Sequence, residues 1–305
     1  MAVVFSSLQM ECVLFLSSPL WYFLRMKREL EKWQKVENSI MREYRGRLWA
    51  PFIDGLKTYS LLSPGDRVAV CISGGKDSML LAVLMRMLQR ISDFPFGLEY
   101  IVMDPGYTDE TLLQIKHNLE ILNIDASIFR TDIFDAALKA EKYPCYLCAR
   151  MRRGWLYKTA REKGCNKIAL GHHRDDVIET VLMGMFYSSQ IQNMPPKLRS
   201  RNYEGMELIR PMYRIAERDI ISWCTDNELT FIRCACSVTE RNAGDGKGSK
   251  REEVKRLIAS LRVDNPHIDD SIFNSIHNVY VSTFPCIREN GEKVSFLRYY
   301  DGDED

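Results

Sequence analysis

The stretch Val68–Leu84 decides the fold and reads Val-Ala-Val-Cys-Ile-Ser-Gly-Gly-Lys-Asp-Ser-Met-Leu-Leu-Ala-Val-Leu. Its first five residues are apolar and typical of a buried strand, whereas its last six are typical of a helix. Between them, Gly74 and Gly75 leave backbone N–H groups accessible to an anion, and the helix N-terminus adds a partial positive charge. The spacing is not that of a Walker A loop. It predicts a different phosphate-binding turn, with a glycine-rich turn of no special function as the alternative.

Further strands and helices alternate on both sides of this turn. The expected elements are a helical segment Lys27–Leu62, a strand Leu98–Met103, a helix Leu112–Leu122, a strand Ala126–Phe129 and a strand Lys167–Leu170. Alternation at this spacing predicts an α/β fold with a doubly wound, mostly parallel sheet and helical extensions at both ends. Ligands bind beyond the carboxyl ends of such strands, where Ser73 and Gly171 are expected.

The chain of 305 residues divides into four expected parts. Residues 1–25 form an apolar extension of doubtful status, 26–62 a helical segment, 63–240 the nucleotide-binding domain, and 241–305 a glycine-rich loop, a basic helix and a tail. Ser17-Ser18-Pro19 interrupts the apolar extension, which also lacks the early positive charge and the convincing small-residue cleavage site of a secretory signal. We therefore expect a cytoplasmic protein without a membrane span, with a membrane anchor as the alternative.

The segment Gly171–Thr180 carries the second polar motif. It reads Gly-His-His-Arg-Asp-Asp-Val-Ile-Glu-Thr, so that Asp175 and Asp176 fall at the expected start of a helix. Carboxylates there are favoured by the helix dipole and can bind Mg²⁺ that accompanies phosphates. The alternative is an acidic helix start beside exposed histidines.

Four of the nine cysteines form two close pairs, Cys145/Cys148 and Cys234/Cys236. In a chain without a secretory signal, such pairs indicate metal or redox chemistry rather than disulfides. Arginines beside the first pair favour its thiolate form. Three cysteines from two segments suit a [4Fe–4S] cluster with one open iron, while a persulfide-carrying redox pair and a structural zinc site with four cysteine ligands are the alternatives. The other cysteines fit core or surface thiols: Cys12, Cys71, Cys165, Cys224 and Cys286.

Several motifs together resemble one known family. The Ser-Gly-Gly-x-Asp-Ser motif resembles the signature of the PP-loop ATP pyrophosphatases (the adenine nucleotide alpha hydrolase, or HUP-like, fold), and Leu170–Thr180 resembles the second motif of PP-loop tRNA-thiolating enzymes. The succession that follows is similar to the TtcA family of tRNA 2-thiocytidine synthetases, over roughly Leu56–Val279. It comprises Met185–Tyr187, Asn193–Arg199, Ile209–Met212 and Glu217–Ile220.

The resemblance implies an ATP-dependent tRNA sulfurtransferase. Such an enzyme adenylates a pyrimidine O2 and replaces it with sulfur through a [4Fe–4S] cluster, with 2-thiocytidine at tRNA position 32 as the expected product. The implied partners are tRNA and a sulfur donor such as a cysteine desulfurase, and a homodimer is expected. The implied cofactors are ATP, Mg²⁺ and the cluster.

The resemblance also implies roles for individual residues. The catalytic candidates are Lys76, Asp77, Asp176 and Cys236. The nucleotide-binding candidates are Cys71, Ile72, Ser73, Gly74, Gly75, Lys76, Asp77, Ser78, Met103, Gly171 and Asp176. The cluster candidates are Cys145, Cys148 and Cys236, with Cys234 as the alternative third ligand, and Asp175 is a candidate Mg²⁺ ligand.

Basic side chains flank these motifs and are candidates for contact with an RNA backbone, or else belong to a solvated helix face. They are Lys197, Arg199, Arg201, Lys247, Lys250, Arg251, Lys255 and Arg256. Two other functions remain open at this point. One is a cluster-free PP-loop ligase or amidotransferase-type enzyme with another substrate, and the other is a nucleotide- and metal-binding regulator.

Overall fold

The computed structural model describes residues 29–139, 144–232, 249–289 and 291–300. The apolar extension 1–25 and the pair Cys234 and Cys236 lie outside these ranges. Within them, no helix has both the length and the apolar character that crossing a membrane would require.

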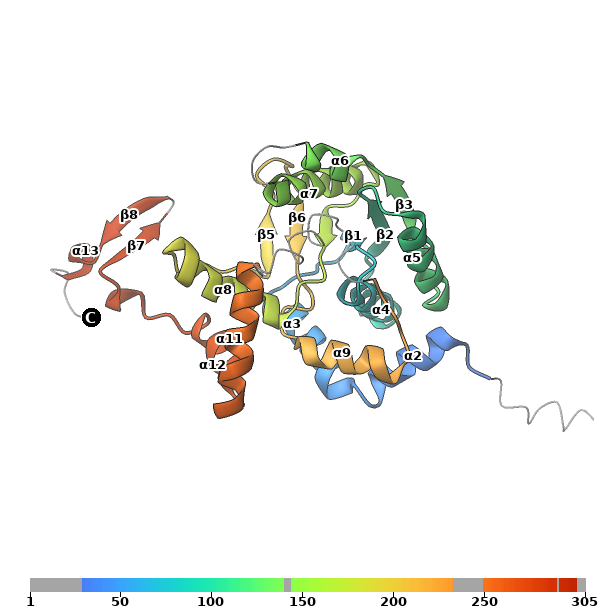
Figure 1. The fold of residues 1–305 in the computed structure, drawn as a ribbon, viewed down its shortest axis with the longest axis horizontal. Helices are drawn as coiled ribbons and strands as arrows, with labels where there is room; N and C mark the ends of the chain where they lie inside the picture. The colour runs from blue at the N-terminus through green and yellow to red at the C-terminus, as the bar shows by residue number, and fades with distance from the viewer. Residues whose placement is uncertain (1–28, 140–143, 233–248, 290, 301–305) are drawn as a thin grey trace, which may run out of the picture.

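A six-stranded sheet forms the centre of the protein (Figure 1). Its pairings are parallel except for the edge strand β5, which runs antiparallel to β6. This confirms the predicted fold class, and the strand boundaries agree with the expected ones to within a few residues. The spatial order is β3 (Ser127–Arg130), β2 (Gly97–Asp104), β1 (Arg67–Ile72), β4 (Lys167–Ala169), β6 (Glu207–Ile209) and β5 (Lys197–Arg199).

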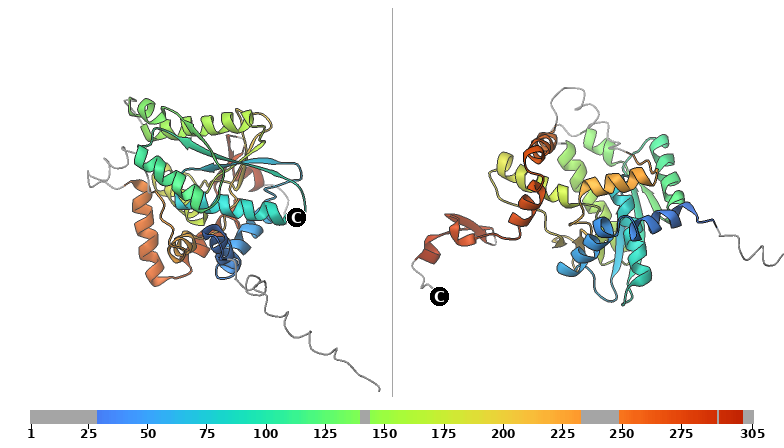
Figure 2. Two further views of the ribbon diagram at one scale, coloured as in Figure 1. Left: turned by 90° about the vertical axis from the view of Figure 1, so that its right-hand side faces the viewer. Right: turned by 90° about the horizontal axis from the view of Figure 1, so that it is seen from below.

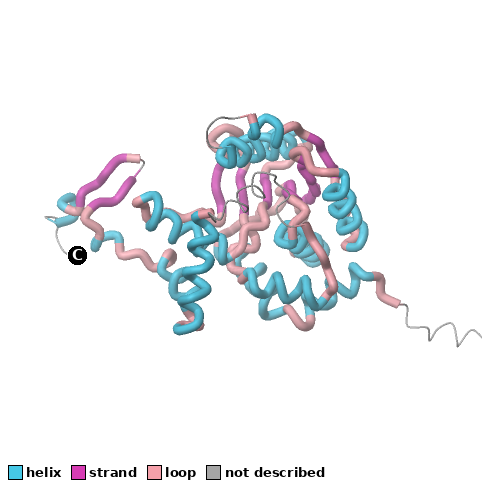
Figure 3. The backbone as a smooth tube through the Cα atoms, in the orientation of Figure 1, coloured by secondary structure: helices cyan, strands magenta, loops and turns pink. Residues whose placement is uncertain are grey.

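Helices cover both faces of the sheet because alternate residues of each buried strand point to opposite sides. In β1, Val68 and Val70 contribute to the core on one face, which α4 (Lys76–Ile91), α5 (Asp109–Ile121) and α9 (Glu217–Asp226) cover. Ala69 and Cys71 face a second core, built against α7 (Pro144–Glu162). A short helix, α6 (Ile133–Leu138), precedes α7 (Figures 1 and 3).

The N-terminal helices share the larger of these cores. They are α2 (Lys32–Met41), a π-helical turn (Arg45–Trp49) and α3 (Ala50–Thr58). Tyr44, Leu48 and Phe52 are almost fully buried against residues of α4 and α9. The predicted helical segment therefore packs as part of the same hydrophobic core as the sheet.

The C-terminal helices form a third cluster beside α8 (Arg174–Ser188). These helices are α11 (Lys250–Asp264) and α12 (Ile268–Ser275), and Val254, Ile258 and Phe273 pack against Val177 and Ile178 of α8. The Ser249 hydroxyl accepts a hydrogen bond from Glu252 N at 3.2 Å and so caps α11. The last described elements extend away from the sheet (Figure 2): a 3-10 turn (Val281–Thr283), the hairpin β7 (Cys286–Glu289) and β8 (Glu292–Ser295), and α13 (Leu297–Tyr300).

A buried ion pair links β4 to the turn that precedes β1. Lys167 is 3% exposed, and its Nζ lies 2.7 Å from Asp66 Oδ2 and 2.9 Å from Leu61 O. Removal of one partner of a buried pair leaves an uncompensated charge and typically costs about 3–5 kcal/mol. We expect Lys167→Met to lower the free energy of unfolding by that amount, as measured by urea denaturation. Because this pair lies at the amino end of the strands, opposite the edge where ligands are expected, ligand binding by the folded variant should stay unchanged.

Candidate active site

The phosphate loop is the predicted phosphate-binding turn, residues Ser73–Ser78. It lies where β1 ends, and β1 lies between its two parallel neighbours β2 and β4. Ser73 N donates to the Ser78 hydroxyl at 3.1 Å, and this hydroxyl donates to Gly75 O at 2.9 Å. Gly74 has φ +86°, a value that favours glycine, and a Cβ there would lie 2.6 Å from Ile115 Cγ1. The predicted turn is therefore present, and it is closed over the first turn of α4.

The second motif packs directly on the first. Gly171 follows β4, and a Cβ at this position would lie 3.0 Å from the backbone of Asp77 and Ser78. The absence of a side chain lets the β4–α8 connection approach the phosphate loop closely. The two motifs that the sequence separates by nearly a hundred residues thus meet at the carboxyl edge of the sheet.

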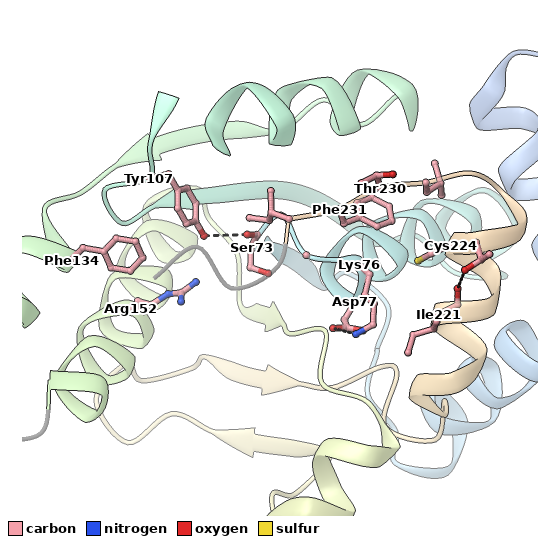
Figure 4. Close-up of a pocket in the computed structure, with 14 residues that line it drawn as sticks. Ser73, Lys76, Asp77, Tyr107, Phe134, Arg152, Ile221, Cys224, Thr230 and Phe231 are labelled. Carbon is pink, nitrogen blue, oxygen red and sulfur yellow. Dashed lines mark hydrogen bonds and ion pairs between the residues drawn. The ribbon is translucent and has the colours of Figure 1, made fainter. Parts of the chain in front are cut away.

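A pocket of about 670 Å³ opens beside the phosphate loop (Figure 4). One wall belongs to the loop, and Tyr107, whose hydroxyl donates to Ser73 O at 3.1 Å, lies at one side. The opposite wall comes from α9 and from the segment that follows it. The full lining is Ser73, Gly75, Lys76, Asp77, Tyr107, Phe134, Arg152, Ile221, Cys224, Thr225, Leu229, Thr230, Phe231 and Ile232.

Most of this far wall was not predicted from the sequence. No motif marks Ile221, Leu229 or Phe231, because apolar residues that line a pocket have the same local pattern as residues that line the core. Conversely, the nucleotide-binding candidates Cys71, Ile72 and Met103 are buried in the strands, at 6%, 2% and 2% exposure. Their predicted role in nucleotide binding stays a prediction.

Charged side chains gather around Lys76. Its Nζ lies 2.9 Å from Glu217 Oε1 and 3.1 Å from Asp77 Oδ1. His173 Nε2 lies 3.8 Å from Asp77 Oδ1 and 3.6 Å from Asp176 Oδ2. The catalytic candidates Lys76, Asp77 and Asp176 are therefore close together, whereas Cys236 lies outside the described residues. Glu217 was not a predicted site residue, although it begins one of the family-like motifs.

Two carboxylates of this cluster, those of Glu217 and Asp176, are held in their charged form. Burial by itself would raise the pKa of Glu217. The hydrogen bond to Lys76 and the charge of Lys76 outweigh this effect and lower the pKa to about 2. Burial also raises the pKa of Asp176, while the interactions with His173, including a hydrogen bond from its backbone N–H, and the charge of Arg251 lower it below its ordinary value. Burial lowers the pKa of Lys76, but Asp77 and Glu217 more than offset this, so that Lys76 stays an ammonium group. The site thus presents a fixed positive charge beside the phosphate loop.

Asp175 and Asp176 lie in the first turn of α8, as expected. Asp175 Oδ2 accepts a hydrogen bond from Glu217 N at 2.7 Å, and its Oδ1 pairs with Arg262 Nη2 at 2.9 Å. Both oxygens therefore have protein partners, and within the described ranges no set of three His, Cys, Asp or Glu residues is arranged to hold a metal. Magnesium binding by Asp175 stays a prediction. The acidic helix start of the alternative is present, but its histidines are not exposed, because His173 is 3% exposed and His172 is only partly exposed.

His172 is held neutral beside this cluster. Burial and the charge of Arg210 lower the pKa of His172 from its ordinary value of 6.5 to about 4. His172 binds a proton near pH 6.5 in the unfolded chain but only near pH 4 in the folded chain. The free energy of unfolding therefore falls as the pH drops from 6.5 to 4. For one group, the loss across the range is about 3 kcal/mol.

We expect His172→Gln to reduce this sensitivity to acid. Urea unfolding at pH 7.5 and pH 4.5 should show a difference in unfolding free energy that is smaller than in the wild type by about 2–3 kcal/mol. His117→Gln, at an exposed histidine of α5, is the control and should leave the difference unchanged. Equal pH dependence in His172→Gln and the wild type would contradict the assignment.

The helix that carries the first cysteine pair, α7, reaches the pocket through Arg152. Cys145 and Cys148 fall in the first turns of α7, and residues three or four apart share a helix face. Cys148 is partly exposed, and Arg152, four residues further along α7, lines the pocket. On the other side, Ile232 lines the pocket and is the last described residue before Cys234. The side chain of Cys145 is not described.

The fold and the phosphate loop define the class of protein. The family model described as a PP-loop domain matches residues 52–241, which is more than half of the chain. Among curated relatives, the tRNA-cytidine(32) 2-sulfurtransferase of Coxiella burnetii (strain CbuG_Q212) is 39% identical over 231 residues, covering 73% of this chain and 86% of that protein. The corresponding protein of Neisseria meningitidis serogroup C is 34% identical over 255 residues, covering 82% and 76%. The chain belongs to the PP-loop family of tRNA-cytidine(32) 2-sulfurtransferases.

A solved structure has the same fold. The U34-tRNA thiolase NcsA from Methanococcus maripaludis, solved with its [4Fe-4S] cluster, matches with a TM-score of 0.60 and 22% sequence identity. The match covers 75% of this chain and 78% of that chain. It supports the arrangement of sheet and helices described above.

Proposed function

We propose that this protein is an ATP-dependent tRNA sulfurtransferase that forms 2-thiocytidine at tRNA position 32. One observation carries the proposal: a single pocket is lined both by the phosphate loop and by Arg152, one helical turn beyond Cys148. A nucleotide bound at Ser73–Asp77 and a sulfur-carrying group bound at the cysteines would then act on one base. The relatives named as tRNA-cytidine(32) 2-sulfurtransferases support the choice of substrate.

In the first half-reaction, the cytidine O2 attacks the α-phosphorus of ATP. A bond forms between O2 and this phosphorus, the bond to the bridging oxygen breaks, and diphosphate leaves. Lys76 is placed to offset the negative charge that develops on the diphosphate, since it is partly buried, charged and held by two carboxylates. The loop N–H groups and the N-terminus of α4 would bind the phosphates. Asp77 and Asp176 would orient Lys76 and His173.

In the second half-reaction, sulfur at the oxidation level of sulfide bonds to C2 of the base, and AMP leaves with the former O2. When bound, a [4Fe–4S] cluster would supply this sulfur through its open iron. The cysteine pattern fits such a group, and the partly exposed Cys148 lies on α7, four residues before Arg152 of the pocket wall. Cys145 and either Cys236 or Cys234 would complete the ligand set, with a cysteine desulfurase as the sulfur donor and the cytoplasm as the site of action.

Two measurements test the proposal. Anaerobically purified protein should contain roughly four iron and four acid-labile sulfide per chain, the content of one cubane cluster. With ATP, sulfide and tRNA, it should release AMP and diphosphate and convert cytidine to 2-thiocytidine, as detected by mass spectrometry of the digested tRNA. Zinc in place of iron, or AMP formation with a small-molecule acceptor and not with tRNA, would instead indicate a cluster-free PP-loop ligase.

A further inference from the structure

We propose that Glu217 and Lys255 are positioning residues for Lys76, and that helix α11 thereby takes part in the ATP reaction. Lys255 holds Glu217, and Glu217 holds the ammonium group of Lys76 beside the phosphate loop. This inference rests on the proposed function in one respect, namely that ATP reacts at this loop. Neither residue was a predicted site residue, and α11 (Lys250–Asp264) lies beyond the matched domain, residues 52–241.

The contacts form a chain of three charges from three helices. Lys76 Nζ of α4 lies 2.9 Å from Glu217 Oε1, and Lys255 Nζ of α11 lies 3.3 Å from Glu217 Oε2. Each oxygen of the Glu217 carboxylate therefore faces one ammonium group. The Glu217 and Lys76 side chains are only 22% and 26% exposed, so solvent screens this pair less than a surface pair.

The position of Glu217 is itself determined by the fold. Glu217 is the first residue of α9, and its backbone N–H donates to Asp175 Oδ2 at 2.7 Å. Asp175 in turn pairs with Arg262 of α11 at 2.9 Å. Glu217 is thus held at its backbone by Asp175 and at its side chain by Lys255. Helix α11 contributes to both, because Arg262 pairs with Asp175 and Lys255 pairs directly with Glu217.

Helix α11 is attached to the site by further ion pairs. Arg251 Nη1 lies 2.9 Å from Asp176 Oδ1, and Lys255 Nζ lies 3.5 Å from Glu179 Oε1. Glu179 is 2% exposed, so its carboxylate depends on these cations for compensation. Arg251 and Lys255, which the sequence suggested for an RNA backbone, therefore face the acidic side of the active site.

This arrangement addresses a specific difficulty of lysine. A lysine side chain is long and flexible, and its rotamer entropy opposes holding its ammonium group in one place. Two carboxylates, Asp77 of α4 and Glu217 of α9, hold Lys76 before ATP arrives. Without the Glu217 carboxylate, Lys76 would pair with Asp77 alone. Its ammonium group would then no longer be preorganised to stabilise the diphosphate.

The test uses the full-length, cluster-loaded protein, four variants with one substitution each, and one double variant. Glu217→Gln should weaken ATP binding about fivefold without tRNA, by equilibrium dialysis, and slow tRNA-dependent AMP formation about thirtyfold under saturating ATP. Lys255→Met should slow AMP formation about tenfold with little change in ATP affinity. Lys255→Arg should restore the rate to within about threefold of the wild type. Glu252→Gln, at an exposed position of the same helix α11, is the control and should match the wild type.

The double variant Glu217→Gln/Lys255→Met shows whether Lys255 affects the rate of AMP formation through Glu217 or independently of it. If Lys255 acts through Glu217, the double variant reacts no more slowly than Glu217→Gln alone, whereas multiplied effects would overturn the inference. Wild-type turnover in Glu217→Gln would overturn it as well. If Lys255→Met does not fold, as judged by its thermal transition, Lys255→Gln, which keeps a donor for Glu179, takes its place.

Failure of the proposed function would be distinguishable from failure of this inference. A wild-type protein that forms no AMP with tRNA would contradict the proposed function, whereas the fivefold loss of ATP affinity in Glu217→Gln would still support the positioning of Lys76. Equal ATP affinity and equal turnover in wild type and Glu217→Gln would contradict the inference alone.

Discussion

Cys148→Ser is expected to abolish tRNA thiolation, with at least a hundredfold loss of rate, while the affinity for ATP stays within about twofold of the wild type. Serine keeps the size of the side chain but not the thiolate, which is the group that binds iron. Cys148 lies on α7, four residues before Arg152 of the pocket wall, and it is not itself among the residues that line the pocket. Thiolation is measured by mass spectrometry of digested tRNA and ATP binding by equilibrium dialysis.

Two comparisons make this result specific to the site. Cys286→Ser, at an exposed cysteine of β7, should retain full activity and full iron content. The iron content of Cys148→Ser should fall together with its activity, because one ligand is missing. Thiolation at the wild-type rate in Cys148→Ser would show that the cysteine pair of α7 has no role in sulfur transfer.

Gly74→Ala is expected to lower ATP affinity by at least thirtyfold and to destabilise the protein. The backbone at Gly74 has φ +86°, where a side chain costs about 1–2 kcal/mol. A Cβ would also lie 2.6 Å from Ile115 Cγ1 and 2.8 Å from Ile232 Cδ1. Because both neighbours are packed side chains, the phosphate loop would have to move away from them. The N–H groups that face the phosphates would move with it.

Gly65→Ala separates the two causes of this effect. Gly65 has φ +82°, nearly the same value, but a Cβ there would meet nothing within 4 Å. It should therefore show the cost of the backbone conformation alone, about 1–2 kcal/mol in urea unfolding, with ATP affinity unchanged. If Gly74→Ala binds ATP as tightly as Gly65→Ala does, close packing of the loop is not required for binding.

The sheet and the phosphate loop were predictable from the sequence because their signals are local. Apolar runs such as Val68–Ile72 and Lys167–Leu170 mark buried strands, and two glycines with a following helix mark an anion site. Their expected boundaries agree with β1 and β4 to within one residue. The carboxylates of Asp175 and Asp176 also fall in the first turn of a helix, as their spacing after the strand indicates.

The wall of the pocket and the charge chain were not predictable in this way. Lys76 and Glu217 are 141 residues apart, and Glu217 and Lys255 are 38 residues apart. An acidic residue at the start of a helix and a basic one within a helix are ordinary surface features in a sequence. Only the packing of α9 and α11 around α4 and α8 brings these side chains into contact.

The sequence by itself therefore determined the class of fold, the phosphate loop, the family and the chemistry expected of the cysteines. These features depend on residue types at short spacing, where backbone geometry and side-chain chemistry act directly. Tertiary structure alone decided which charges hold Lys76, which residues enclose the pocket, and that the cysteine helix α7 reaches it. Pairings between distant segments depend on the summed packing of the whole core, which no short stretch of sequence specifies.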